Sequence, residues 1–267
     1  MQRILIMGLL LVLIAPAPGG AVDGKKVKRP RPYEYGRVTI DNFSSKAGVE
    51  PVFFEHWSHR DKYTCRLCHV DLGFAMKAGG SEMTAADNQR GYFCGSCHDG
   101  KRVYNGREIF AACTASRRTD ESPRCQRCHA TGRNPAREQM FADFAAKMPK
   151  ERFGNGVDWE RAEDSGLIKP QEYLEGLSVK RPPLAAQKDF AIEGKVAGMP
   201  DIVFSHKKHT VWNGCELCHP DIFVGIKKGA TKYNMAEIFA GQYCGVCHVT
   251  VAFPLTDCQR CHTQPVN

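Results

Sequence analysis

Apolar residues form one continuous run near the start of the chain and otherwise occur in short groups. The run, Ile4 to Ile14, follows the basic Arg3 and precedes the small residues Gly19 to Ala21. This order is typical of a secretory signal peptide, so we expect residues 1–21 to be removed on export. The run is too short to span a bilayer, although an uncleaved segment could still anchor the chain to a membrane. No later run is apolar enough to cross one.

Two later segments combine short β-prone runs with a glycine-bearing turn. They are residues 37–56, RVTIDNFSSKAGVEPVFFEH, and residues 190–206, FAIEGKVAGMPDIVFSH. Each predicts a small β-hairpin. Ahead of the first hairpin, residues 22–34 are basic and rich in proline, which predicts a flexible tail.

A helix is predicted between the two hairpins. Asn134 and Pro135 are typical of an N-cap and a first helical position, and Pro149 ends the helical pattern. The apolar positions in between share one face, which we expect to pack against a domain rather than bind a cofactor. They are Met140, Phe141, Phe144, Ala145 and Met148. The rest of the connector up to residue 189 predicts ordered but mostly irregular structure.

The cysteines add a specific chemistry, because twelve of the thirteen form six CxxC pairs and a histidine follows every pair. In an exported chain a disulfide framework is the simplest use of many cysteines, and CxxC pairs also hold zinc or iron–sulfur clusters. None of these uses requires the histidine. CxxCH is instead the attachment motif of c-type haem, in which two thioether bonds hold the porphyrin and the histidine ligates the iron.

The motifs therefore predict six covalently attached c-type haems. The attachment cysteines are Cys65, Cys68, Cys94, Cys97, Cys125, Cys128, Cys215, Cys218, Cys244, Cys247, Cys258 and Cys261. The proximal iron ligands are His69, His98, His129, His219, His248 and His262.

The remaining four histidines occur as two HxxH pairs, His56 with His59 and His206 with His209. The first histidine of each pair lies nine residues before the first cysteine of the next CxxCH motif. A tethered haem is thus their nearest partner, and we expect all four to be distal iron ligands. A solvated pair of histidines is the alternative. Two imidazoles this close in sequence can serve two different irons and hold the haems near each other.

The two halves of the chain are copies of one unit. Adding 150 to the numbers of His56, His59, Cys65 and Cys94 gives His206, His209, Cys215 and Cys244. The first copy carries a 17-residue insertion before its third motif, and this insertion contains the unpaired Cys113. We interpret Cys113 as a free structural cysteine, with an intermolecular disulfide or a haem ligand as alternatives.

A phenylalanine-led HxxH followed by three CxxCH motifs resembles the triheme periplasmic cytochromes of the cytochrome c7 type, relatives of cytochrome c3, here in tandem. The resemblance covers residues 35–132 and 190–264. It implies that His56 and His206 are distal ligands of the first haem of each copy, and His59 and His209 of the second. In that family the distal ligand of the third haem lies just before the second CxxCH motif, as histidine or, in some multidomain relatives, methionine.

No histidine is left for the third haems, so methionine is the expected substitute. Met235 is assigned to the haem on Cys258 and Cys261, with a flexible core filler as the alternative role. The position 150 residues earlier is Ala85, and Met83 is nearby. A shift of two residues along a helix turns a side chain by about 200°, so Met83 would need a local change of backbone to reach its iron. An open or differently ligated haem is the alternative there.

These counts predict the fold class. Without residues 1–21, six haems would share 246 residues, or 41 residues each. So short a chain per cofactor cannot form a layered core, and the haems must make the core instead. We expect a haem-cored multihaem cytochrome c with little regular secondary structure. It would have two triheme modules, 35–132 and 190–264, each a hairpin followed by short helices and loops, and a partly helical connector over 133–189.

The formal charge of +8 is at first sight typical of a protein that binds nucleic acid or an anionic surface. Loss of Arg3 removes one positive charge, and each ferric haem with ionised propionates contributes about −1, which leaves the holoprotein at about +1. Nucleic acid is therefore not an expected partner.

The expected function is electron transfer without catalysis, because two strong axial ligands leave no open position on an iron. The expected partners are other redox proteins or an external electron acceptor, in the periplasm or outside the cell, and self-association is left open. The resemblance implies anaerobic respiratory chains, including those that reduce metal oxides. The alternatives are a reductase of nitrite-like oxyanions, using an open haem on Cys125 and Cys128, and a zinc or disulfide-rich binding module.

Overall fold

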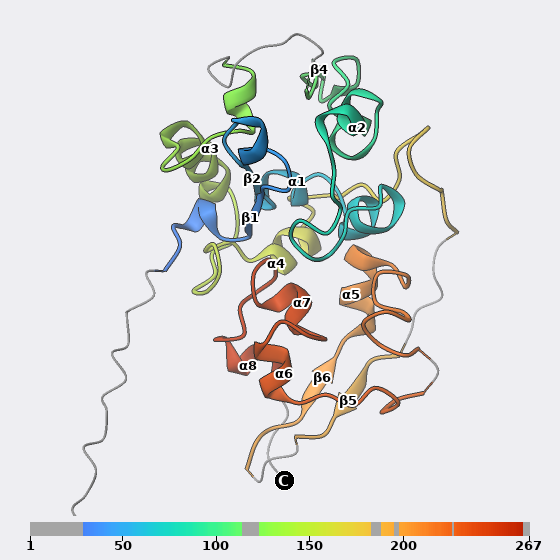
Figure 1. Ribbon diagram of the computed structural model, residues 1–267. Coiled ribbons are helices and arrows are strands. Elements are labelled where there is room, and N and C mark those ends of the chain that lie inside the picture. The colour runs from blue at the N-terminus through green and yellow to red at the C-terminus, as the bar shows by residue number, and fades with distance from the viewer. Residues whose placement is uncertain (1–28, 114–122, 183–187, 195–197, 226, 264–267) are drawn as a thin grey trace, which may run out of the picture.

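The structure is a computed structural model that describes residues 29–113, 123–182, 188–194, 198–225 and 227–263. The predicted signal peptide lies outside the described residues. In Figure 1 the N-terminal half, blue to green, and the C-terminal half, orange to red, form two groups of short elements. We call residues 35–132 module 1, residues 133–189 the connector and residues 190–264 module 2. Within the described ranges, none of the helices has the length and apolar character needed to cross a membrane.

Each module begins with a two-stranded antiparallel hairpin, as the sequence predicts. In module 1, β1 (Arg37–Ile40) pairs with β2 (Val52–Glu55). In module 2, β5 (Phe190–Ile192) pairs with β6 (Ile202–Phe204). The second strand of each hairpin runs directly into an HxxH pair, so the hairpin places these histidines.

Short helical segments surround the CxxCH motifs, which agrees with the predicted small share of regular structure. The 3₁₀ turns η1 (Pro32–Glu34) and η2 (Ser45–Ala47) lie near the first hairpin. Module 1 then has α1 (Trp57–Arg60), η3 (Leu67–Asp71), α2 (Ala85–Gln89), η4 (Phe93–Ser96) and η5 (Cys125–Arg127). Module 2 has α5 (His206–Asn213), α6 (Met235–Phe239), α7 (Gly245–His248) and α8 (Cys258–Cys261).

Helices α2 and α6 occupy the same place in the two copies. Each begins with a capping box, in which the N-cap residue and the third helical residue bond reciprocally: Thr84 with Asp87, and Asn234 with Glu237. A capping box satisfies two N–H groups that the helix start leaves unpaired. It therefore makes Ala85 and Met235 the first helical residues of two helices that start 150 residues apart.

The insertion of module 1 contains, in its described part, a second small hairpin. Strands β3 (Val103–Tyr104) and β4 (Arg107–Glu108) pair antiparallel between the second and third CxxCH motifs. The turn is made by Asn105 and Gly106, whose φ angles are 51° and 74°. Asn-Gly is a strong hairpin signal because both residues tolerate positive φ, so this hairpin could have been predicted from the sequence.

The connector builds the main apolar core of the polypeptide. Helix α3 (Pro135–Ala146) begins after the predicted N-cap, Asn134, whose side chain accepts a hydrogen bond from the backbone N–H of Arg137. A second helix, α4 (Trp159–Asp164), packs against it. We call the buried residues of this region the connector cluster: Tyr33, Trp57, Phe141, Val157, Trp159, Ala162 and Ile168.

The predicted apolar face of α3 is mostly correct. Phe141 belongs to the connector cluster, and Phe144, Ala145 and Met148 pack against it. Met140, in contrast, is 61 % exposed, so its inclusion in the face was wrong. The prediction that this face packs rather than binds a cofactor agrees with its contacts to aromatic side chains.

The prediction of a flexible tail over residues 22–34 is wrong at its C-terminal end. Tyr33 is only 1 % exposed and belongs to the connector cluster together with Trp57 and Trp159. Burial of an aromatic side chain stabilises by roughly 1.5–3 kcal/mol, and this gain orders the end of the segment although its other residues are mostly proline and basic.

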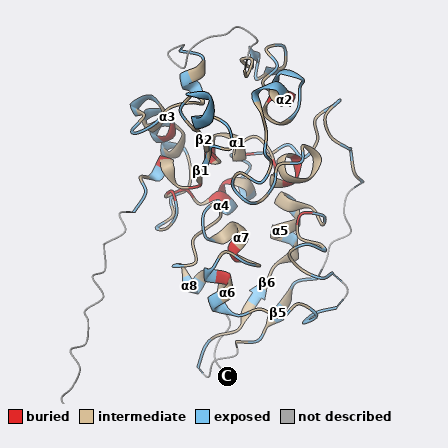
Figure 2. Cartoon of the chain, in the orientation of Figure 1, coloured by how far each residue is buried: buried red, intermediate tan, exposed pale blue. Residues whose placement is uncertain are grey.

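Buried apolar side chains are most numerous in the connector cluster. Figure 2 shows buried segments where α1, α3 and α4 meet, and further ones at α2, α6 and α7. Outside the connector cluster, the buried apolar residues of the described chain are Leu67, Leu217 and Ile238. The described residues of neither module form a layered core, as expected for a fold whose interior is filled by cofactors.

Polar contacts also link the three parts. The Tyr35 hydroxyl of module 1 donates to the Ala252 carbonyl of module 2 over 2.6 Å. Arg181 of the connector pairs with Asp71 of module 1 at 2.9 Å and with Glu216 of module 2 at 2.6 Å. The modules are therefore held against each other and against the connector.

Candidate haem-binding sites

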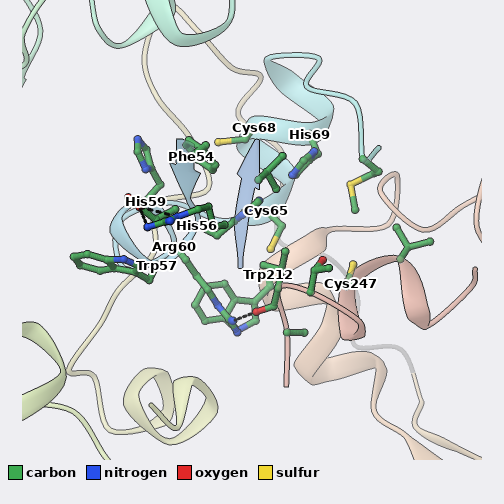
Figure 3. Close-up of a pocket in the computed structure, with 18 of the residues that line it drawn as sticks. Phe54, His56, Trp57, His59, Arg60, Cys65, Cys68, His69, Trp212 and Cys247 are labelled. Atoms are coloured by element: carbon green, nitrogen blue, oxygen red, sulfur yellow. Dashed lines mark hydrogen bonds and ion pairs between the residues drawn. The ribbon is translucent and has the colours of Figure 1, made fainter. Parts of the chain in front are cut away.

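One continuous cavity of about 1850 Å³ runs through both modules. At least one residue of each predicted CxxCH motif lines it, as do His56, His59 and His209. A pocket for a single small molecule usually measures about 300–1000 Å³, so this cavity has room for several cofactors. Figure 3 shows the part of its wall where His56, His69, Cys65 and Cys68 lie.

Three pairs of imidazole rings face each other along the cavity. The ring centroids of His56 and His69 are 6.4 Å apart, and the two rings are nearly parallel, with an interplanar angle of 12°. The centroids of His59 and His98 are 6.2 Å apart, and those of His209 and His248 are 6.3 Å apart. Each pair joins a histidine of an HxxH motif to the histidine of a CxxCH motif.

This spacing fits one metal ion between two imidazoles. A metal–imidazole bond is about 2 Å long, so rings that ligate the same ion from opposite sides have centroids about 6 Å apart. A pair supplies two axial ligands, which is what a six-coordinate haem iron takes from the protein. Among the described residues, no group of three histidine, cysteine or acidic side chains converges as a metal site by itself.

The fourth pair that the resemblance implies is not formed in this way. Among the described residues, the ring of His206 lies against Phe190 and Phe204, with centroids 5.2 and 5.0 Å away. The Nδ1 of His219, its expected partner, lies 2.6 Å from the Phe223 carbonyl oxygen. The assignment of His206 to the haem on Cys215 and Cys218 therefore stays a prediction without support from a ring pair.

Eight of the ten histidines have Nδ1 within hydrogen-bond distance of a main-chain carbonyl oxygen, and His59 and His98 do not. The Nδ1 atoms of His56 and His69 lie 2.6 and 2.9 Å from the carbonyl oxygens of Gly36 and Phe74. Further Nδ1 atoms lie near a main-chain carbonyl oxygen in His129, His206, His209, His219, His248 and His262. An Nδ1–H that donates to a carbonyl leaves Nε2 with its lone pair free for a metal.

Burial also keeps the paired histidines neutral, which is the protonation state that binds a metal. Desolvation lowers the pKa of His59 to about 3 and the pKa of His56 and of His248 to about 4. The same effect lowers the pKa of His69, His98 and His209.

A phenylalanine positions both histidines of each HxxH pair. The ring centroid of Phe54 lies 4.9 Å from His56 and 4.7 Å from His59. In module 2, the centroid of Phe204 lies 5.0 Å from His206 and 4.4 Å from His209. Because each phenylalanine is at the end of a hairpin strand, the hairpin sets the direction of two imidazoles at once.

The cysteines of the six motifs are reduced and largely turned inward. All thirteen cysteines are free, and Cys258 is the exposed one. Burial raises the pKa of the Cys68, Cys94 and Cys247 thiols to about 12, so they are protonated at neutral pH.

The third motif of each module lies against the hairpin. His129 forms an isolated antiparallel bridge with Val52, and its Nδ1 lies 2.6 Å from the Glu50 carbonyl oxygen. His262 forms the equivalent bridge with Ile202, and its Nδ1 lies 2.8 Å from the Pro200 carbonyl oxygen. The two modules thus share the same bridge and the same Nδ1 contact at their third motifs, despite the insertion in module 1.

The two candidate methionine ligands are placed differently. Met235 is the first residue of α6, lines the cavity and is 41 % exposed. Met83 also lines the cavity, but it precedes the N-cap Thr84 and its Sδ lies 3.9 Å from Cys94 Sγ. Met83 is therefore not on the helix, so the turn of about 200° between its side chain and that of Ala85 does not apply to it. Neither residue is shown to bind an iron, and both assignments stay predictions.

Cys113 lies among the cysteines of module 1. Its Sγ is 3.8 Å from the amide Nδ2 of Asn88, and burial raises the pKa of its thiol. Its charge state also influences the Cys94 and Cys128 thiols. This placement agrees with a partly buried structural cysteine.

The glycine inside the second CxxCH motif of each module is required by packing. A Cβ added at Gly245 would overlap the Ile238 carbonyl oxygen of α6, and one added at Gly95 would overlap the Asn88 carbonyl oxygen of α2. The motif therefore sits directly against the end of the preceding helix.

We expect Gly245→Ala to destabilise the holoprotein by about 1–3 kcal/mol, the usual cost of overpacking. Denaturant unfolding of the holoprotein measures this, with Val246→Ala, at the next position, as the control. An unchanged midpoint for Gly245→Ala would show that α6 does not pack against the motif.

Comparison with known families decides the identity of these sites. A model of cytochrome c7 and related cytochrome c matches residues 52–130 and 202–263, more than half of the chain. The chain belongs to the cytochrome c7 family.

As a member of the cytochrome c7 family, the protein is a multihaem c-type cytochrome of electron transport with covalently attached haem. The two matched ranges are its tandem copies. Similar solved structures include the C-terminal hexaheme fragment of GSU1996, at 25% identity and a TM-score of 0.26, covering 89% of this chain and 99% of that one. The N-terminal hexaheme fragment of GSU1996 has 22% identity, a TM-score of 0.24 and coverages of 85% and 98%. No curated protein matches the chain.

Proposed function

We propose that this cytochrome c7 family member is an exported hexahaem electron carrier that exchanges electrons with other redox proteins or an external acceptor. The observation that carries the proposal is the set of three histidine ring pairs, with centroids 6.2–6.4 Å apart, along one cavity. Each pair contains the histidine of a CxxCH motif, so attachment and ligation converge on the same place.

In this proposal each module, 35–132 or 190–264, holds three haems through its CxxCH motifs. His56, His59 and His209 are the distal partners of His69, His98 and His248, and their ring pairs support this assignment. His206 is assigned to His219 by the repeat alone. Met235 and Met83 are assigned to the third motifs, with the support of their places on the cavity wall.

A haem that is held by two axial protein ligands supplies reversible one-electron transfer and leaves no position for a substrate. The chain contributes the rest. Carbonyl groups orient the imidazoles, phenylalanines hold both histidines of an HxxH pair, and the connector holds the modules together so that the sites stay in one continuous cavity. Its proposed setting is the periplasm or the outside of the cell, in anaerobic respiration that includes reduction of metal oxides, and the resemblance to triheme cytochromes supports this.

The exported protein, purified from a host that attaches c-type haem, should have the mass of the mature chain plus six haems. A potentiometric titration followed by absorbance should then show reversible reduction of all six, with low-spin spectra. A mass equal to the bare polypeptide would contradict the proposal. Carbon monoxide that binds the reduced protein without displacing a protein ligand would reveal an open haem and support a reductase instead.

A further inference from the structure

Arg60 is a cation placed where module 1, the connector and module 2 meet. It is the last residue of α1, directly after His59. Its guanidinium carbon lies 4.6 Å from the ring centroid of Trp159 and 5.0 Å from that of Trp212. Its Nη1 donates to the Val251 carbonyl over 3.2 Å. We call Arg60, Trp159, Trp212 and Val251 the junction.

The positive charge of Arg60 is not balanced by any side chain that the structure describes. Among the described residues, no carboxylate forms an ion pair with it, and its Nε is buried without a hydrogen-bond partner. The acidic side chains next to it in sequence are occupied, Glu55 by Arg37 and Arg137, and Asp61 by Lys62. A buried charge is normally paired, because its desolvation costs several kcal/mol. An anionic group other than a side chain would complete this site.

The groups around Arg60 belong to two different predicted haem sites. On the module 1 side are Cys65 and His56, whose carbonyl accepts from the backbone N–H of Arg60 over 2.8 Å. On the module 2 side are His248 and Cys247, whose carbonyl accepts from the backbone N–H of Val251 over 2.9 Å. His56 is paired with His69, and His248 with His209. Arg60 and all four of these neighbours line the same cavity. One cation therefore stands beside two imidazole pairs that different modules contribute.

We propose that Arg60 is a counter-charge shared by two haem sites, the first of module 1 and the second of module 2, and that it favours the reduced form of both. The inference rests on the proposed function. A ferric haem with ionised propionates carries about −1, and one added electron makes it about −2. A cation held in partly dehydrated surroundings stabilises the more negative state, because Coulomb attraction is stronger there than in water.

The repeat shows that this role is separate from iron ligation. The residue 150 positions after Arg60 is Thr210, which follows His209 as Arg60 follows His59. The Thr210 hydroxyl donates to the His206 carbonyl over 2.8 Å and carries no charge. His209 still forms its ring pair with His248. The arginine is thus not needed to build the ligand pair, and module 1 alone supplies the charge at the junction.

The test is a haem-resolved potentiometric titration of Arg60→Met holoprotein, with Lys62→Met as a matched control. Lys62 carries the same charge two residues away, but Asp61 pairs with it at 2.5 Å. In Arg60→Met we expect the ratio of reduced to oxidised form to fall at least about tenfold for two haems. This fall equals a decrease of about 59 mV in the reduction potential of a one-electron couple. Lys62→Met should leave those two potentials unchanged, and Arg60→Lys should restore most of the loss.

Arg60→Gln, which keeps a donor for Val251, decides the question if Arg60→Met does not mature. Unchanged potentials in a neutral variant that carries six haems would overturn the inference and leave the proposed function intact. An equal shift at all six haems would also overturn it, because that indicates a general structural change. Absence of haem or of reversible reduction in the wild-type protein would instead overturn the proposed function, and this inference with it.

Discussion

Produced without haem, the chain should lose the cooperative unfolding transition of the holoprotein and most of its ordered structure. The reason is the small polypeptide core. Outside the connector cluster, the buried apolar residues of the described chain are Leu67, Leu217 and Ile238. An isolated two-stranded hairpin is marginal in water, and each module has no larger sheet within its described residues. A haem that binds only the native state adds its binding free energy to the free energy of unfolding. A chain without haem lacks that stability.

Far-ultraviolet circular dichroism during thermal and denaturant unfolding measures this, on holoprotein and on chain made in a compartment that does not attach haem. Cys113→Ser holoprotein is the control, because it removes a cysteine but keeps all six motifs. The three tryptophans report the connector region separately, since Trp57 and Trp159 belong to the connector cluster and Trp212 packs against it. A haem-free chain that unfolds with the midpoint and slope of the holoprotein would show that the polypeptide folds by itself.

The parts of the fold that were predictable have local causes in the sequence. The hairpins follow from β-prone runs around a glycine-bearing turn, and α3 starts where Asn134 and Pro135 set an N-cap and first turn. The histidine ring pairs agree with the pairing that the family resemblance implies for three of four cases. Sequence spacing could not show the ring geometry, because His206 has the same spacing as His56 and does not form a ring pair among the described residues.

The connector cluster could not be predicted, because it is assembled from distant single residues. Tyr33, Trp57 and Trp159 each stand among polar or charged neighbours, and no periodic pattern marks them. Arg60 was missed for a related reason, since arginine is usually exposed and only its tertiary contacts place it at the junction. The sequence nevertheless contains a signal. The HxxH block of the first copy, FEHWSHRDK, has Trp57 and Arg60 at positions where the block of the second copy, FSHKKHTVW, has neither tryptophan nor arginine.

Replacing Met235 by histidine should lower the reduction potential of the haem on Cys258 and Cys261, by on the order of 0.1 V. The physical reason is that axial methionine favours the reduced iron more than axial histidine does. Met235 begins α6 and lines the cavity, which is the placement that a ligand for this haem needs. A haem-resolved potentiometric titration measures the shift, and the other potentials should change little.

The repeat offers a reciprocal variant, Ala85→Met. Ala85 is the first residue of α2, as Met235 is of α6, and both helices begin with a capping box. A methionine there should therefore reach the haem on Cys125 and Cys128 and raise its potential, unless Met83 already ligates that iron from the chain before the N-cap. Met83→Leu separates the two cases, since it lowers the potential only if Met83 is the ligand. If Met235→His leaves every potential unchanged, the first turn of α6 does not supply the ligand, and the argument from register fails for α2 as well.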